Sequence, residues 1–311
     1  MPKTPYSTRI LTFKDYPENL QNIHRPPASL HIAGDLPPTH YKYLCVIGSR
    51  TFSTYGRDAC KKIITGLAGY PICIVSGLAL GIDSLAHEAA LEAGLPTIAF
   101  PGSGLGLNVL YPSMKRKLAL RILEHGGALV SEYEHNQIGA YWTFPNRNRL
   151  MAGISHAVLI IEARRGSGTL GTAKYAEDFN RDLMAVPGDI NSELSYGPHM
   201  LIQRGAAMIT CAEDILEALG FGDPIQKELI SANPKDSNQN YHSRKQRMIN
   251  LDELNLTPEE KKICSFLKIE KLSATDLIEK TGLSSSQLNI LISELEMKGL
   301  VKEEGGRYGV K

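Results

Sequence analysis

Short apolar runs alternate with amphipathic stretches between Tyr43 and Gly220. The apolar runs have the length of buried strands and cover Tyr43–Ile47, Ile72–Val75, Thr97–Phe100, Ala128–Val130, Ala157–Ile161, Met184–Val186 and Ala207–Ile209. Between them, apolar positions recur at helical spacing over about Tyr55–Leu67, Asp83–Ala93, Met114–Glu124, Leu170–Asn180 and Glu213–Leu219. Alternating strands and helices indicate βαβ units, and strands that are apolar throughout indicate a sheet covered on both faces. The pattern predicts an α/β protein with a doubly wound, mostly parallel sheet over residues 43–220.

The segments on either side of this region lack the alternation. Residues 1–42 contain Tyr16-Pro17, Pro26-Pro27 and Pro37-Pro38, and such prolines exclude long helices. We expect this segment to be an extended lead-in that wraps the sheet domain. Residues 221–256 are polar, most markedly over 233–238, and are predicted to be a linker.

The C-terminal residues 257–311 show a third pattern. Thr257 is placed to cap a helix, with Pro258 in its first turn and Glu260 at the capping-box position. A second helix ends at the turn Thr281–Leu283, and a third is predicted from about Ser284 to Lys298. Two short segments at 299–302 and 305–310 then suit a two-stranded wing. The arrangement predicts a small winged-helix domain.

Glycine-rich loops follow most of the predicted strands. They comprise Gly48-Ser49-Arg50, Ser76–Asp83, Pro101–Gly104, Arg164–Thr169 and Pro187–Asp189. The carboxyl ends of parallel strands meet at one rim of a doubly wound sheet, and ligands bind there. Because glycine lets backbone N–H groups approach an anion at a helix N-terminus, we predict an anion site at this rim.

The overall composition is that of an ordinary globular chain. Its 311 residues include 34 Lys+Arg and 33 Asp+Glu, which gives a formal net charge of +1, and 42% are hydrophobic. This balance excludes a uniformly basic chromatin-type binder and a disordered charged tail.

The local charge differs from this average. Residues 141–174 hold five basic residues, Arg147, Arg149, Arg164, Arg165 and Lys174, against the single acid Glu162. Tyr141, Trp142 and Phe144 lie beside them, and cations interleaved with aromatic rings suit single-stranded nucleic acid. We expect Trp142 to lie in the core, and Arg50 and Arg147 to belong to the site.

Several enzyme classes lack their signatures. Gly166–Gly171 satisfies G-x-G-x-x-G, but it follows a late strand, whereas the dinucleotide fingerprint follows the first. No P-loop, H-E-x-x-H or G-x-S-x-G motif occurs, so no cofactor or metal is expected. His87 is expected to pack on the sheet, and Asp83 to be a carboxylate at a helix N-terminus.

The cysteines and the N-terminus indicate the compartment. The five cysteines form no C-x-x-C pair, which argues against a zinc site or a disulfide framework. The first residues lack an apolar segment, and no apolar run reaches about 18 residues. We expect a cytoplasmic protein that does not contact a membrane.

The loop motifs, taken in order, form a signature. They are Tyr16-Pro17, Gly48-Ser49-Arg50, Ser76–His87, Tyr111-Pro112, Ser131–Tyr133, Phe144–Gly153, Glu162-Ala163, Ser167–Ala173, Val186–Gly188 and Leu201–Ala206. This signature resembles the DNA-processing protein A family (DprA, also called Smf) over about residues 10–220. The tail resembles the winged-helix module that many members carry.

The resemblance implies an extended Rossmann-like fold without catalysis. Members bind and protect single-stranded DNA, form homodimers through the sheet domain and load the RecA recombinase in natural transformation. The implied DNA-binding residues are Ser49, Arg50, Phe144, Arg147, Asn148, Ser167, Gly168, Thr169 and Lys174. Arg50, Arg147 and Lys174 are expected to hold phosphates, the 167–169 loop to cap another, and Phe144 to stack on a base. Leu80 stands where members often have a basic residue.

Two other functions stay open. Related Rossmann-like folds cleave nucleoside monophosphates, although Gly166–Thr169 and Glu177 do not match the motif of such glycosidase-like hydrolases. A winged-helix transcription regulator is disfavoured because residues 284–297, the expected recognition helix, contain no Lys or Arg. We expect the tail to be a protein-contact or regulatory module.

Overall fold

The structure is a computed structural model that describes residues 5–221, 257–269, 272–297, 301–304 and 307–310. The chain divides into two units, Met1–Lys235 and Asp236–Lys311, each described by itself below. In the described part of the first unit, nine strands pair into one sheet: β1 (Arg9–Leu11), β2 (Leu30–Gly34), β3 (Lys42–Ile47), β4 (Ile72–Ser76), β5 (Thr97–Ala99), β6 (Ala128–Ser131), β7 (Ala157–Ile160), β8 (Asp182–Ala185) and β9 (Ala207–Met208).

The strand order confirms the predicted fold class. The sheet runs β1-β2-β6-β5-β4-β3-β7-β8-β9, and the strands from β6 to β9 in this order pair in parallel. Six consecutive strands, β5-β4-β3-β7-β8-β9, follow the order 3-2-1-4-5-6 of a Rossmann fold. The other three strands extend this core beyond β5.

The N-terminal segment, expected to be an extended lead-in, contributes two strands to the sheet. β1 and β2 continue the sheet antiparallel beyond β6, with His31 opposite Ser131 and Gly34 opposite Ala128. These strands are too short to show a period in the sequence. β6 supplies the hydrogen-bond partners of β2, and β2 supplies those of β1. Leu30 and Ile32 bury one face of β2 in the same core as α1 (Glu18–Gln21).

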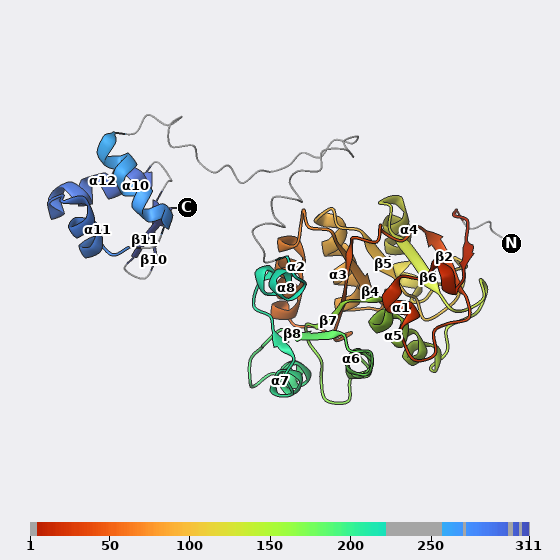
Figure 1. The fold of residues 1–311 in the computed structure, drawn as a ribbon. Coiled ribbons are helices and arrows are strands. Elements are labelled where there is room, and N and C mark those ends of the chain that lie inside the picture. Colours follow the sequence, from red (N-terminus) through yellow and green to blue (C-terminus); the bar gives the residue numbers. More distant parts are fainter. Residues whose placement is uncertain (1–4, 222–256, 270–271, 298–300, 305–306, 311) are drawn as a thin grey trace. The chain divides into compact units, whose positions relative to one another are not determined.

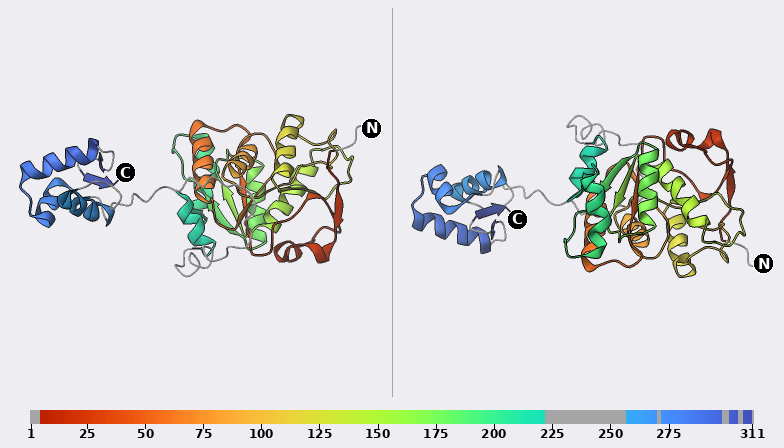
Figure 2. Two further views of the ribbon diagram at one scale, coloured as in Figure 1. Left: turned by 90° about the horizontal axis from the view of Figure 1, so that it is seen from above. Right: turned by 90° about the horizontal axis from the view of Figure 1, so that it is seen from below.

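Helices cover both faces of the sheet (Figures 1 and 2). One face carries α2 (Thr54–Gly66), α3 (Ile82–Glu92), α4 (Arg116–Glu124) and α8 (Ala212–Ala218), and the other carries α1, α5 (Thr143–Ile154), α6 (Thr169–Asp178) and α7 (Tyr196–Gln203). Alternate residues of β3 therefore pack in the hydrophobic cores on opposite faces of the sheet. Leu44 and Val46 pack under α2 and α3, whereas Cys45 and Ile47 pack with residues of α5 and α6. Burial on both faces explains why the strands are apolar throughout.

Helix α5 was not predicted, and its composition explains why. Its buried face contains Arg147, Leu150, Met151 and Ile154, which have helical spacing, but an arginine occupies the first apolar position. Pro145 lies in the first turn, where a missing N–H costs no hydrogen bond. The helix carries three of the predicted site residues.

The second unit has the predicted helices and wing. It comprises α10 (Pro258–Ile269), α11 (Ala274–Thr281), α12 (Ser285–Met297), β10 (Val301–Glu304) and β11 (Arg307–Val310). The capping box is confirmed, since Thr257 N–H donates to Glu260 Oε2 at 2.9 Å and Glu260 N–H to Thr257 Oγ1 at 3.3 Å. The predicted linker 221–256 lies outside the described residues except for Phe221, which packs on Tyr70 of the first unit.

Two further observations concern membranes and thiols. No helix in the described residues is long and apolar enough to cross a membrane. Cys45, Cys60 and Cys73 are buried free thiols, and burial raises the pKa of Cys60 to about 12. These cysteines therefore act as small core side chains.

Candidate nucleic-acid interface

The predicted site lies where the strand order reverses. From β3 the chain proceeds to β4 on one side, whereas β7 lies on the other, so the loops after β3 and β7 diverge. A pocket of about 1050 Å³ opens between these loops, α5 and α6. Crevices at such switch points are the usual ligand sites of doubly wound sheets.

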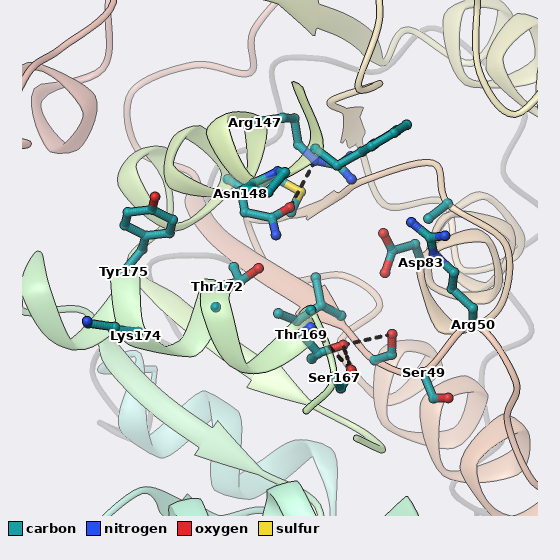
Figure 3. Close-up of a pocket in the computed structure, with 18 of the residues that line it drawn as sticks. Ser49, Arg50, Asp83, Arg147, Asn148, Ser167, Thr169, Thr172, Lys174 and Tyr175 are labelled. Atoms are coloured by element: carbon teal, nitrogen blue, oxygen red, sulfur yellow. Dashed lines mark hydrogen bonds between the residues drawn. The ribbon is translucent and has the colours of Figure 1, made fainter. Parts of the chain in front are cut away.

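All nine predicted residues line this one pocket (Figure 3). The loop after β3 contributes Ser49 and Arg50, α5 contributes Phe144, Arg147 and Asn148, and the β7–α6 loop and α6 contribute Ser167, Gly168, Thr169 and Lys174. Arg50 and Lys174 lie at opposite ends of the pocket and are exposed. Arg164 and Arg165 add two more exposed cations to its lining.

Hydrogen bonds of Ser49 stabilise the loop that follows β3. Its N–H donates to the carbonyl of Glu162 at 2.7 Å, and its hydroxyl donates to the carbonyl of Thr51 at 2.5 Å. The Ser49 side chain is thus engaged inside the loop, while the next residue, Arg50, projects from it. The guanidinium of Arg50 lies over the ring of Phe144, with Cζ 5.9 Å from the ring centroid, a cation–π arrangement.

Gly81 allows the Arg50 loop to pack against the start of α3. Its φ is +89°, and a Cβ there would collide with the Ser49 carbonyl oxygen and the Arg50 Cα. Ile82 N–H donates to the same Ser49 carbonyl at 3.2 Å. A glycine is therefore needed both for its backbone angle and for the close approach.

We expect Gly81→Ala to lower the free energy of unfolding by at least about 1–3 kcal/mol, the cost of a strained backbone angle, plus the cost of the collision. Gly69→Ala is the matched control, because Gly69 has φ +86° but nothing within 4 Å of a Cβ. Urea denaturation of both variants measures the difference. Equal losses in the two variants would show that the contact with the Arg50 loop is unimportant.

Arg147 was expected to hold a phosphate, but the structure buries it beneath the pocket. It is 6% exposed, and its Nη1 donates to the carbonyl oxygens of Gly77 at 2.5 Å and of Phe100. Burial lowers the pKa of Arg147, and the nearby Asp83 carboxylate opposes this. Helical periodicity explains the placement, since position 147 faces the sheet. Arg147 therefore joins α5 to the loops that follow β4 and β5.

Asp83 is the buried carboxylate that faces this cation. Burial raises its pKa, while the Arg147 charge and hydrogen bonds from the backbone N–H groups of Gly48, Gly77 and Ala79 act in the opposite direction. A Cβ at Gly77 would collide with both charged side chains. As expected, Asp83 lies in the first turn of α3, and His87 one turn later is buried, with Nδ1 2.7 Å from Thr97 Oγ1.

The aromatic residues are placed differently from the prediction. Phe144 is half-buried between the Arg50 guanidinium and the ring of Tyr111, whose centroid is 5.5 Å away. Trp142 was predicted to be a core residue, and this was wrong: it precedes α5 and is 44% exposed, with its ring centroid 5.7 Å from that of Tyr133. Tyr141 is 89% exposed and lines the pocket, so it offers the freer ring face.

The 167–169 loop is a weaker anion cradle than predicted. Ser167 N–H donates to the Arg164 carbonyl at 3.1 Å, and Thr169 N–H donates to Ser167 Oγ at 3.3 Å. Thr169 Oγ1 donates to the Gly48 carbonyl at 3.1 Å, which joins the two loops on either side of the pocket. Two of the three N–H groups expected to cap a phosphate are thus bonded within the loop.

Other lining residues were not assigned to the site from the sequence. They include Asp83, Tyr141, Thr172, Tyr175 and Asp178. Thr169, Thr172 and Tyr175 recur at three-residue spacing along α6, so this polar face of the helix was visible in the sequence. No group of His, Cys, Asp or Glu suited to a metal ion occurs among the described residues.

Comparisons with known proteins identify relatives over most of the chain. The chain is 42% identical over 207 residues to the protein Smf of Escherichia coli, a match that covers 67% of this chain and 55% of that protein. It is 39% identical over 206 residues to the DNA processing protein DprA of Streptococcus pneumoniae, covering 66% of this chain and 72% of that protein. The chain thus spans about half the length of its Escherichia coli relative.

Solved structures show the same fold. The crystal structure of Streptococcus pneumoniae DprA matches with a TM-score of 0.63 at 37% identity, over 69% of this chain and 74% of that one. Helicobacter pylori DNA processing protein A, studied for its single-stranded DNA binding mode, matches with a TM-score of 0.60 at 27% identity, over 69% and 96%. The DprA winged helix domain matches residues 251–307. Since the family model of DNA recombination-mediator protein A matches residues 8–220, the chain belongs to that family.

Proposed function

We propose that this protein binds single-stranded DNA in the pocket at the switch point and delivers it to the RecA recombinase. The observation that carries the proposal is the convergence of all nine predicted residues on one pocket from separate loops and helices. Its Helicobacter pylori relative, studied for its single-stranded DNA binding mode, supports the same ligand.

The arrangement of charge suits a flexible strand. Arg50 and Lys174 at the two ends of the pocket (Figure 3) bind phosphates of the strand, and Arg164 and Arg165 of the β7–α6 loop also line the pocket. The bases of a single strand are free to turn into the pocket, whereas those of a duplex stay stacked and paired. The confined position of these cations accounts for nucleic-acid binding by a chain with a net charge of only +1.

The test is the affinity for single-stranded and duplex oligonucleotides, measured by fluorescence anisotropy over a series of salt concentrations. We expect tighter binding of the single strand, with affinity falling as salt rises because phosphate contacts release counterions. Equal affinity for the two forms, or binding that does not respond to salt, would contradict the proposal.

We also propose that the protein is not an enzyme. The carboxylates in the described lining of the pocket are Asp83 and Asp178. Asp83 accepts hydrogen bonds from three backbone N–H groups and is 6% exposed, which suits a structural role better than attack on a sugar. Release of free base from nucleoside monophosphates would instead support the hydrolase alternative.

We expect Tyr141→Ala to weaken single-strand binding more than Phe144→Leu does, with no loss of thermal stability in either variant. A base stacked on an aromatic ring contributes about 1–3 kcal/mol, and the exposed Tyr141 ring is open for stacking. The salt dependence should not change, because stacking involves no charge. Titrations and thermal midpoints of both variants check this, and a larger loss of affinity for Phe144→Leu would restore Phe144 as the stacking residue.

The proposed handover to RecA and homodimer formation rest on the family resemblance. Met208 of the edge strand β9 is 55% exposed, and Ile190 in the loop that follows β8 is 86% exposed; a second copy would cover them. Sedimentation equilibrium tests the dimer. Assembly of RecA on a single strand already covered by another binding protein, with and without this protein, tests the delivery.

We propose that the winged-helix unit contacts protein and does not read duplex DNA. In α12, Gln287 and Asn289 are exposed, but residues 284–297 contain no Lys or Arg to hold phosphates. Removal of residues 257–311 is therefore expected to change duplex affinity by less than about twofold. A tenfold or larger loss, measured in the same anisotropy assay, would contradict this assignment.

A further inference from the structure

The side chain of Asn148 is held in one orientation by a buried neighbour. Its Oδ1 accepts a hydrogen bond from Arg147 Nε at 3.1 Å. Arg147 is itself fixed, because its Nη1 donates to the carbonyls of Gly77 and Phe100 in the interior. The guanidinium therefore cannot turn away from Asn148 without leaving two buried carbonyl groups unpaired.

This contact decides which end of the amide faces the ligand. An arginine side chain has donors and no acceptor, so the Asn148 oxygen must point toward it. A flipped amide would place two N–H donors against each other. The Nδ2 group consequently points away from Arg147 and into the pocket (Figure 3). Asn148 thus presents donors to the pocket, with its oxygen turned away.

The surroundings place a base opposite this donor. The cations that bind phosphates, Arg50 and Lys174, lie at the two ends of the pocket, and Asn148 lies between them on the α5 wall (Figure 3). Tyr141, whose ring is exposed, precedes the same helix and lines the same pocket. A strand held at its phosphates by the two ends turns a base toward the α5 wall that lies between them.

We propose that Asn148 selects a base with a carbonyl group at the purine 6-position or the pyrimidine 4-position, guanine or thymine, at one position of the bound strand. The inference rests on the proposed function and adds a sequence preference to it. Guanine O6 and thymine O4 accept hydrogen bonds, whereas adenine and cytosine carry an amino donor at the equivalent position. A free asparagine pairs with adenine through both its oxygen and its nitrogen. The orientation imposed by Arg147 removes the oxygen from that pairing.

The test compares oligonucleotides that differ in one chemical group. Two strands of equal length contain either hypoxanthine or adenine at every purine, which exchanges the 6-carbonyl for a 6-amino group and keeps the ring system. We expect the wild-type protein to bind the hypoxanthine strand about 5- to 10-fold more tightly, within the range for a base-specific contact. Asn148→Ala should bring this ratio close to one, mainly by weakening the hypoxanthine complex.

Two further variants test the mechanism. Asn146→Ala is the matched control, since Asn146 lies on α5 and does not line the pocket, and it should keep the wild-type ratio. Asn148→Gln moves the amide by one methylene, which separates it from Arg147 Nε, and should lose most of the preference. Arg147→Lys tests Arg147 as a positioning residue through the same ratio. If that variant does not fold, the affinity ratio measured for Asn148→Gln tests the same contact between Asn148 and Arg147.

The outcomes separate this inference from the proposed function. Equal wild-type affinity for the two strands would contradict the base preference and leave single-strand binding intact. No binding to either strand would contradict both proposals. A loss of equal size on both strands in Asn148→Ala would show that Asn148 contacts the sugar–phosphate backbone, which also contradicts the inference.

Discussion

Arg50→Glu is expected to weaken binding of single-stranded DNA by at least about 30-fold, because a charged hydrogen bond to phosphate contributes about 1.5–3 kcal/mol and the substitution adds repulsion. Arg50 projects from its loop at one end of the pocket, supported by the Phe144 ring. The slope of log affinity against log salt should fall by about 0.7 for the lost cation and by a similar amount for the added anion. Anisotropy titrations at several salt concentrations measure both quantities.

Arg57→Glu makes the same change of charge outside the pocket. Arg57 is exposed on α2, where its Nε lies 2.8 Å from Asp58 Oδ1. We expect this variant to lose only a few-fold in affinity, through the long-range field. Equal losses for the two variants would mean that the total charge governs binding, and would contradict the assignment of Arg50 to the site.

Arg147→Met is expected to lower the free energy of unfolding by about 3–5 kcal/mol, the usual cost of removing one partner of a buried charge pair. Asp83 would stay buried without its opposing cation, and the carbonyls of Gly77 and Phe100 would lose their donor. Urea denaturation at pH 7 measures the loss. In the background of Asp83→Asn, Arg147→Met should lower the free energy of unfolding by less than it does in the wild type. Additive losses in the double variant would show that the two charges are not coupled.

The pH dependence of this variant follows from the sign of the Asp83 shift. Burial raises the pKa of Asp83 above its unfolded value, and Arg147 restrains that rise. Without Arg147 the folded pKa rises further. A carboxyl group with a raised folded pKa favours folding below its unfolded pKa, and this contribution is lost as the pH rises through the folded pKa. The stability deficit of Arg147→Met should therefore be smaller near pH 4 than at pH 7.

The sequence predicted the parallel part of the sheet well because each strand carries its own signal. Strands buried on both faces, such as β3 and β7, must be apolar at every position, and this is visible without knowledge of the neighbours. β1 and β2 lack such a signal, since β6 sets the register of β2 from about 100 residues away and β2 sets that of β1. α5 was missed because Arg147 occupies a position on its buried face.

The membership of the site was easier to predict than the role of each residue. Glycine-rich loops at the carboxyl ends of parallel strands must converge, and the nine residues, those of α5 being implied by the family resemblance, do line one pocket. Whether a given arginine faces solvent or protein depends on partners far along the chain. Arg50 and Arg147 look alike in sequence, but only Arg147 meets the carbonyls of Gly77 and Phe100.

The attachment of α5 to two sheet loops through Arg147 has a kinetic consequence. Because Arg147 fixes α5 to the loops that follow β4 and β5, the helix does not need to rearrange when a strand enters the pocket. Little conformational entropy of the protein is then lost on binding. Encounter is then governed by diffusion and the field of the exposed cations, and its rate should vary little with base sequence. Differences between strands should appear in how long each one stays bound, so residence time is the quantity in which the proposed base preference is expected.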